Sequence, residues 1–240
     1  CLCLRKHLSC VGAKWKDLLI VPRLLKGKSN LRNLELSYCT IGDPGAVALA
    51  EGLKFNAVLK TLSLVGNRIG NVGGTALADA LKEVNAVVLN HLNLGLNKID
   101  DAGAAAFGEA LKLKLNTLVL CDNKIGDTGA AALGEALKGN GVLHCLDLCG
   151  NKIGDAGAAA LADALKANVV LKDLYLGRNR IGDAGATAIA DALKVNAVLR
   201  GLNLYVNSIG WEMLEQIEST MRVRYLSAKA VARAVAAVGH

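Results

Sequence analysis

The side chains that could bind a metal ion or attack a substrate are few, and most of them are cysteines. The chain of 240 residues holds seven cysteines and four histidines. His144, Cys145 and Cys149 lie close together in the sequence, and Cys121 precedes Cys149 by 28 residues. Cys145 and Cys149 are four residues apart, which is about 13 Å on an extended segment. They cannot share one tetrahedral metal ion without leaving strand geometry, so we expect no metal site.

The other reactive residues form no recognisable catalytic pattern. The histidines have no partner at the spacing of a nucleophilic Ser or Cys site; they are His7, His91, His144 and His240. The glycine-rich run 70–74 lacks the Lys-Ser/Thr pair of a phosphate-binding loop. Asp100 and Asp101 fall at an expected helix start, where negative charge favours the helix dipole. We therefore expect a protein that is not an enzyme and needs no cofactor.

The elements that must position any site follow a repeat of about 28 residues. The phrase LxxLxLxxNxIGDxGAxALAxALK recurs seven times, starting at Leu31, Leu59, Leu89, Leu115, Leu143, Leu171 and Leu199. The spacing is 28 residues except for 30 and then 26 around Leu89, with two extra residues near Val87 and Val88. A fixed period of this length indicates a stacked repeat array. We expect an N-terminal cap or degenerate repeat at 1–30, seven repeats at 31–209, and a capping helix with a basic tail at 210–240.

Each repeat predicts a short strand followed by a helix. The two leucines of LxL point inward and their neighbours outward. An asparagine then satisfies buried backbone groups; these are Asn67, Asn97, Asn123, Asn151, Asn179 and Asn207, and Cys39 takes the place in the first repeat. An Asp or Asn is expected to be the helix N-cap, followed in the first repeat by Pro44 as first helical residue. The expected N-caps are Asp43, Asn71, Asp101, Asp127, Asp155 and Asp183.

The helix pattern places small apolar residues toward the strands. In the fifth repeat Ala158, Leu161 and Leu165 form an inward stripe, while Asp163 and Lys166 point outward. Strands stack about 4.8 Å apart and helices about 8–9 Å apart, so the stack should bend. We predict a right-handed β-α superhelix in a curved arc, with a parallel sheet on the concave face and helices on the convex face.

These residues resemble those of a known family. The segments LDLCGNKIGDAGAAALADALKAN and LYLGRNRIGDAGATAIADALKVN closely resemble the ribonuclease-inhibitor-like leucine-rich repeats, particularly those in the C-terminal region of intracellular NOD-like receptors. The resemblance covers about 31–209 and implies an α/β leucine-rich repeat solenoid. It also implies a protein-binding scaffold or sensor that holds a macromolecular partner on its concave face. The family suggests two alternatives: a GTPase-activating protein of the Ran-activator type, or a ribonuclease-inhibitor-like protein inhibitor.

The outward strand positions are the expected binding surface, because they are free of the core and differ between repeats. The residue between the two leucines runs Glu35, Ser63, Asn93, Val119, Asp147, Tyr175, Asn203. Three of the four tyrosines fall on this surface, and interface centres favour Tyr and Arg. Within this surface, we expect the partner to bind at the last two repeats. The candidate partner-binding residues are Glu35, Tyr38, Asp147, Asp173, Tyr175, Arg178 and Tyr205.

The net charge of +7 is concentrated at the N-terminus. Residues 1–30 hold seven Lys and Arg against Asp17 alone, whereas residues 31–210 hold 17 residues of each sign. A nucleic-acid groove would carry its basic stripe on the working surface, so we do not expect a nucleic-acid partner. A loop column of Arg68, Lys98, Lys124, Lys152 and Arg180 is expected to be compensated by the helix-start acids. The basic N-terminus is either part of a transit peptide or a solvated cap, and we favour the cap.

The two ends leave further alternatives open. Because the sequence begins at Cys1 rather than Met, we expect a fragment or a processed product. Cys1-x-Cys3-x6-Cys10 resembles part of the disulfide cap of secreted leucine-rich repeat proteins, but no cysteine follows Cys149 and no asparagine lies in a glycosylation sequon. We favour reduced thiols in the cytoplasm, where Cys121 and Cys149 pair only under oxidation. The tail, with Lys229 and Arg233, forms either an amphipathic surface helix or, as we favour, a cap over the solenoid end.

Overall fold

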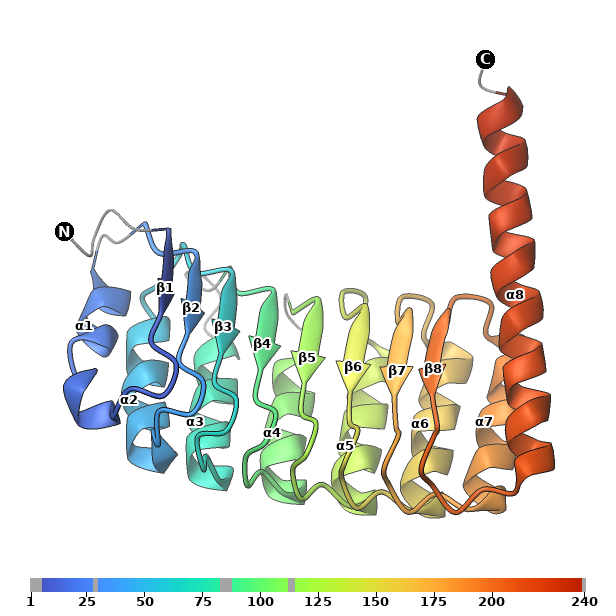
Figure 1. The fold of residues 1–240 in the computed structure, drawn as a ribbon, viewed down its shortest axis with the longest axis horizontal. Helices are drawn as coiled ribbons and strands as arrows, with labels where there is room; N and C mark the ends of the chain where they lie inside the picture. Colours follow the sequence, from blue (N-terminus) through green and yellow to red (C-terminus); the bar gives the residue numbers. More distant parts are fainter. Residues whose placement is uncertain (1–5, 28–29, 83–87, 112–114, 239–240) are drawn as a thin grey trace.

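Eight short parallel strands stand side by side in sequence order. The computed structural model describes the backbone of residues 6–27, 30–82, 88–111 and 115–238, and side chains as far as residue 224. The strands form one open sheet in which β1 and β8 are the edges (Figure 1). They are β1 (His7–Ser9), β2 (Asn33–Glu35), β3 (Thr61–Ser63), β4 (His91–Asn93), β5 (Thr117–Val119), β6 (Cys145–Asp147), β7 (Asp173–Tyr175) and β8 (Gly201–Asn203).

The helices α1 to α7 cover one face of this sheet, α8 stands at the β8 end, and no helix of the described residues lies on the other face (Figure 1). Neighbouring helices pack on each other in sequence order. They are α1 (Val21–Lys26), α2 (Gly42–Leu53), α3 (Asn71–Lys82), α4 (Asp101–Ala110), α5 (Asp127–Lys138), α6 (Asp155–Ala167), α7 (Asp183–Val195) and α8 (Trp211–Val238), with a 3-10 turn η2 (Trp15–Asp17) after β1. The predicted α/β solenoid of leucine-rich repeats is therefore confirmed.

The core is a ladder of leucines. The strand register places Leu34 beside Leu62, and the same leucine recurs at the centre of every later strand. The 30-residue spacing before β4 leaves this register intact, because the extra residues precede the strand; Val87 lies outside the described residues. The predicted helix stripe is confirmed, since Ala158, Leu161 and Leu165 are fully buried. Each such leucine stabilises the fold by about 1.5–3 kcal/mol.

The asparagine that follows each strand satisfies buried backbone groups, as predicted. The Asn123 amide nitrogen donates to the carbonyls of Leu94 (2.9 Å) and Leu120 (3.1 Å), and its oxygen accepts from the Ile99 N–H (2.9 Å). It therefore joins two successive repeats. In the first repeat the Cys39 thiol donates to the Cys10 carbonyl at 2.8 Å, so the thiol fills the place of the amide.

The predicted N-caps are wrong, because each aspartate acts on the next repeat. Asp127 is the first residue of α5, and Gly126 occupies the cap position without a side chain to offer. The Asp127 carboxylate instead accepts from the N–H groups of Gly154 (2.6 Å) and Gly157 (3.0 Å), where α6 begins. Asp43, Asp101 and Asp155 make the same pair of bonds, and Asp183 makes the first of them to Gly210.

One repeat departs from this scheme, and one further prediction about a helix start is wrong. Asn71 replaces the aspartate in its repeat, and its amide bonds to Asp100, which caps its own helix by accepting from the Ala102 N–H (3.0 Å). Pro44 is the third residue of α2 rather than the first, because that helix begins at Gly42.

A second buried asparagine, not predicted from the sequence, closes the helical end of the repeat. The Asn168 amide nitrogen donates to the Leu137 carbonyl (2.7 Å), and its oxygen accepts from the Leu171 N–H (2.7 Å). Asn56, Asn140 and Asn196 make equivalent bonds. In the units that begin at Asn56, Asn140, Asn168 and Asn196, both ends of the strand-helix unit are therefore tied to a neighbouring unit by a side-chain amide.

The two ends of the stack differ. At the N-terminus β1 pairs with β2, and α1 packs on α2, so residues 6–27 have the layout of a short repeat; Cys1 and Cys3 lie outside the described residues. At the other end α8 spans 28 residues, about 42 Å, and its C-terminal half extends past the sheet (Figure 1). The side chains of Lys229 and Arg233 are not among those described. No described helix has both the length and the apolar character needed to cross a membrane.

Candidate functional site

The helix-free side of the sheet presents the variable residues. We call the surface formed by the outward side chains of β1 to β8, and of the three residues after each strand, the strand face. In β2 to β7 the central leucine is buried and its two neighbours are half-buried. The positions predicted to face outward therefore do so, while the core beneath them stays uniform.

Three of the predicted site residues gather on β6 and β7. Tyr175 pairs in register with Asp147, and Asp173 lies two residues before Tyr175 on the same strand. Burial raises the pKa of the Tyr175 hydroxyl, and the negative charges of Asp173 and Asp147 raise it further. The phenol therefore remains a neutral hydrogen-bond donor, and no acceptor for it is found among the described residues. One carboxylate oxygen of Asp147 is occupied, because it accepts from the Cys149 N–H (2.9 Å).

Arg178 does not join this group as the sequence predicted. Its Nη1 lies 3.4 Å from Asp122 Oδ1, two repeats away. Gly150 stands between them, and a Cβ there would collide with the Asp122 carboxylate. The absence of a side chain at Gly150 thus opens the path for the ion pair. Both partners are partly exposed, so the pair contributes about 0–1 kcal/mol to stability.

Every strand is followed by a residue in the left-handed conformation. The residues are Gly12, Tyr38, Gly66, Leu96, Asp122, Gly150, Arg178 and Val206, with φ between 51° and 74°. Only three of these are glycine, although the conformation is unfavourable for other residues. The side chains of Tyr38, Leu96 and Val206 are 54%, 46% and 75% exposed. This row therefore lifts large side chains off the sheet at the same point in successive repeats.

The cysteines of the strand face are poor nucleophiles. Burial, together with the charges of nearby aspartates, raises the pKa of Cys121 and Cys145 to about 11 and that of Cys149 to about 12. Because the thiolate is the reactive form, these thiols are unreactive at neutral pH. Cys121 and Cys149 follow the adjacent strands β5 and β6, in agreement with the predicted stacking, and all five cysteines among the described residues are free. Within the described residues no group of three or more His, Cys, Asp or Glu could hold a metal ion.

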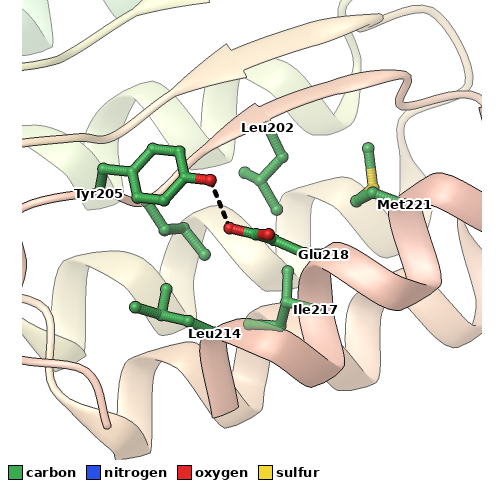
Figure 2. Close-up of a pocket in the computed structure, with 7 residues that line it drawn as sticks. Leu202, Tyr205, Leu214, Ile217, Glu218 and Met221 are labelled. Atoms are coloured by element: carbon green, nitrogen blue, oxygen red, sulfur yellow. Dashed lines mark hydrogen bonds between the residues drawn. The ribbon is translucent and has the colours of Figure 1, made fainter. Parts of the chain in front are cut away.

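Tyr205 contacts the terminal helix instead of standing free. Its hydroxyl donates to Glu218 Oε1 of α8 at 2.5 Å (Figure 2). This bond, together with the charge of Glu218, raises the pKa of Tyr205. Below the pair lies a cavity of about 60 Å³ lined by Leu202, Leu204, Leu214, Ile217 and Met221. Ligand pockets are usually about 300–1,000 Å³, so this space is a packing gap beneath α8.

The other predicted site residues lie at the opposite end of the sheet. Glu35 accepts a hydrogen bond from the Ser9 hydroxyl (3.0 Å), and Tyr38 follows β2. Five strand spacings, about 24 Å, separate β2 from β7. Sequence reasoning missed Asp122 and Glu218. Asp122 could have been found, because it shares the column of Arg178 with a glycine between them.

The loop column of basic residues is exposed but is not compensated as predicted. Among the described residues, Arg68, Lys98, Lys124, Lys152 and Arg180 form no ion pair with the aspartates that follow. The reason is that those carboxylates are directed at glycine N–H groups of the next repeat.

An open parallel sheet, a leucine core, two asparagine ladders and helices on one side define a solenoid of leucine-rich repeats. The chain belongs to the Leucine Rich repeat family, whose model matches residues 27–50, 55–78, 87–108, 112–134, 139–162 and 167–190.

Two solved structures are similar to this chain at low identity. Leiomodin-1 actin-binding site 2 is 19% identical, with a TM-score of 0.52 over 80% of this chain and 95% of that chain. The C-terminal domain of tropomodulin from Caenorhabditis elegans is 12% identical, with a TM-score of 0.49 over 79% and 98%. At these identities the likeness shows the fold alone. Among curated proteins, none matches this chain.

Proposed function

We propose that this chain is a protein-binding module, a scaffold or sensor without catalytic activity, that holds its partner on the strand face. The observation that carries the proposal is the group of Asp147, Asp173 and Tyr175. It offers an aromatic surface, a hydroxyl with no acceptor among the described residues, and two carboxylates, all half-buried on a rigid sheet. Interface centres favour such groups, because a fixed tyrosine loses little entropy on binding.

The family supports a protein as partner. The name of the leiomodin-1 structure describes it as an actin-binding site, so a repeat module of this shape can serve protein binding. At 19% identity that name does not select actin for this chain. The strand face mixes the acids of β6 and β7 with Arg178 and with the uncharged side chains of β3, Thr61 and Ser63, which lends no specific support to a ribonuclease inhibitor. No residue supports GTPase activation.

The finer assignments are also part of the proposal. The repeats are of the ribonuclease-inhibitor-like kind seen in NOD-like receptors, on the strength of their GDAGAxALADALK phrase. Residues 1–30 serve as the opening repeat or cap, 31–209 as the seven binding repeats, and 210–240 as the closing cap. Unreactive, unpaired thiols on the strand face fit a reducing compartment, the cytoplasm.

The test compares two double variants at matching positions of the register. Tyr175→Ala/Asp173→Ala removes the proposed contact, and Ser63→Ala/Thr61→Ala changes the equivalent positions of β3. Each protein, with its melting temperature checked, captures partners from a reducing cell extract, and bound proteins are quantified by mass spectrometry. We expect a partner that is depleted at least about tenfold by the first variant and retained by the second. Equal capture by both variants would show that this patch is not the binding site.

A further inference from the structure

A second hollow lies at the N-terminal end of the molecule, away from the tyrosine and aspartates of β6 and β7. Its volume is about 560 Å³, and it is lined by Gly12, Ala13, Lys14, Trp15, Lys16, Tyr38 and Thr40. We call it the N-terminal hollow. Unlike the gap beneath α8, it is within the size range of ligand pockets.

The walls of this hollow are fixed by the fold. The Gly12 N–H donates to the Ser37 carbonyl (2.9 Å), and the Trp15 N–H donates to the Cys39 carbonyl (3.0 Å). The Trp15 ring packs against α2, where a Cβ at Gly45 would lie 2.8 Å from Trp15 Cε2. Tyr38 is held in the left-handed conformation with its ring across Gly66. The hollow is therefore present before any ligand arrives.

The charge of the hollow is positive. Lys14 and Lys16 are exposed, and neither forms an ion pair with a described residue. The acid in the same segment is Asp17, whereas Lys6, Arg23 and Lys26 add further positive charge nearby in the chain. Asp43 does not offset it by an ion pair, since its carboxylate accepts from Gly70 and Gly73 of the next repeat. Two free ammonium groups beside two aromatic rings match carboxylates next to an apolar side chain.

We propose that the N-terminal hollow binds an acidic peptide segment of a protein partner. Carboxylates of the segment pair with Lys14 and Lys16, and an apolar side chain between them rests on Tyr38 and the edge of Trp15. This deepens the proposed function by naming a partner chemistry, but at a separate place on the molecule. The two contacts lie about 24 Å apart across the sheet, so one partner can engage both.

Nucleic acid fits the same charges less well. A nucleic-acid backbone needs a continuous basic stripe. Beyond the N-terminal segment, residues 31–210 hold as many acidic as basic side chains, 17 of each, so the surplus of positive charge is local. A hollow of this size accommodates one or two side chains, and lysine ammonium groups bind single carboxylates as point charges.

The experiment uses a fluorescein-labelled octapeptide of six glutamates around a central Leu-Phe pair. Its binding to the full chain is followed by fluorescence anisotropy at low salt, about 50 mM, and again at about 200 mM. We expect binding that Lys14→Glu/Lys16→Glu weakens at least about tenfold. Lys124→Glu/Lys152→Glu has the same change in net charge on the loop column and should alter binding less than about threefold.

Two more variants separate the contributions. Tyr38→Ala, which leaves all charges in place, should weaken the octapeptide about threefold or more and have no effect on an all-glutamate octapeptide. Tyr175→Ala/Asp173→Ala should bind the octapeptide as the unaltered chain does, so failure of the proposed function does not imply failure here.

The outcomes that overturn the proposal are distinct. Absence of binding at low salt, or equal weakening by both charge-reversed pairs, means that the hollow is not an acidic-peptide site. An octamer of deoxythymidine that binds more tightly than the peptide, and is lost in the Lys14/Lys16 variant, would assign the hollow to nucleic acid instead.

Discussion

The left-handed residue after each strand decides which side chains rise above the sheet. Tyr38 and Arg178 occupy this position, and both point away from the core at the edge of the strand face. A non-glycine residue in this conformation costs about 1–2 kcal/mol. The cost recurs in five of the eight strands, so this row stores strain where the molecule presents its most variable groups.

Val206 should be the most strained of these residues, because it is β-branched as well as left-handed. Its side chain is 75% exposed and so contributes little to the core. We expect Val206→Gly to raise the free energy of unfolding by about 1 kcal/mol. Urea denaturation followed by circular dichroism measures the change.

The matched control is Val72→Gly in the first turn of α3, where the valine is also exposed but helical. Glycine in a helix costs about 0.5–1 kcal/mol, so the two substitutions should shift the midpoint in opposite directions. A loss of stability in both would mean that the left-handed row is not strained.

A side chain's position could be predicted from the sequence where it depends on one repeat alone, but not where it depends on a contact with a distant residue. The outward placement of Asp147, Asp173 and Tyr175 follows from strand alternation and was correct. The partners of Arg178 and Tyr205 were not predicted. Arg178 reaches over Gly150 to a residue 56 positions earlier, and Tyr205 meets a helix whose direction the sequence pattern does not define.

At the scale of the element, helix starts are stabilised by the preceding repeat. The Asp127 carboxylate accepts from two N–H groups of the next repeat, at Gly154 and at Gly157 within α6. Gly157 has no room for a side chain, since a Cβ would lie 2.7 Å from that carboxylate oxygen. The GDxG phrase therefore supplies both sides of the contact between successive repeats. The aspartate of one copy is the acceptor, and the two glycines of the next copy are the donors.

Removing this acceptor should destabilise two repeats at once. We expect Asp127→Ala to lower the free energy of unfolding by about 1–2 kcal/mol, because the two N–H groups lose a charged partner. Asp163→Ala on α6 removes a carboxylate that pairs with Lys166 on the exposed helix surface, and should leave the free energy of unfolding nearly unchanged, because exposed ion pairs contribute little. Urea denaturation measures the free energy of unfolding of both variants. An equal loss of stability in the two variants would contradict the inter-repeat cap.

The sequence predicted the helices and strands better than the bonds between them. Strand register and the buried stripe follow from periodicity, which each repeat displays by itself. The cap was assigned to the wrong helix because an aspartate at a helix start looks the same whether it serves its own helix or the next. The role of the second asparagine, at Asn168 and its equivalents, was not predicted, because it directly follows a helix end and bonds to the preceding repeat.

At the scale of the whole molecule, contacts run between neighbouring repeats. The stability of such a stack is the sum of the stabilities of the single repeats and of the interfaces between neighbours. A destabilising substitution at one end should therefore leave the repeats at the other end folded. Ile217 of α8 is 3% exposed and borders the gap beneath Tyr205 and Glu218. It is the buried anchor of the terminal helix among the residues whose side chains are described.

We expect Ile217→Ala to loosen α8 and β8 without affecting the other end. The substitution costs about 2–4 kcal/mol locally, and amide hydrogen exchange should speed up in α8 and β8 while β2 to β4 keep their protection. Ser219→Ala, on the exposed side of the same helix, is the control and should leave exchange unchanged. Faster exchange throughout the sheet would show that the stack unfolds as one unit.

The direction of the inter-repeat cap has a consequence for how the chain is made. On the ribosome the N-terminal repeats emerge first, and, apart from the repeat of Asn71, each carries the carboxylate that the next helix start requires. A newly synthesised segment therefore follows its acceptor along the chain. The order of synthesis and the order of capping coincide in these repeats, so the acceptor of each cap is made before its donors.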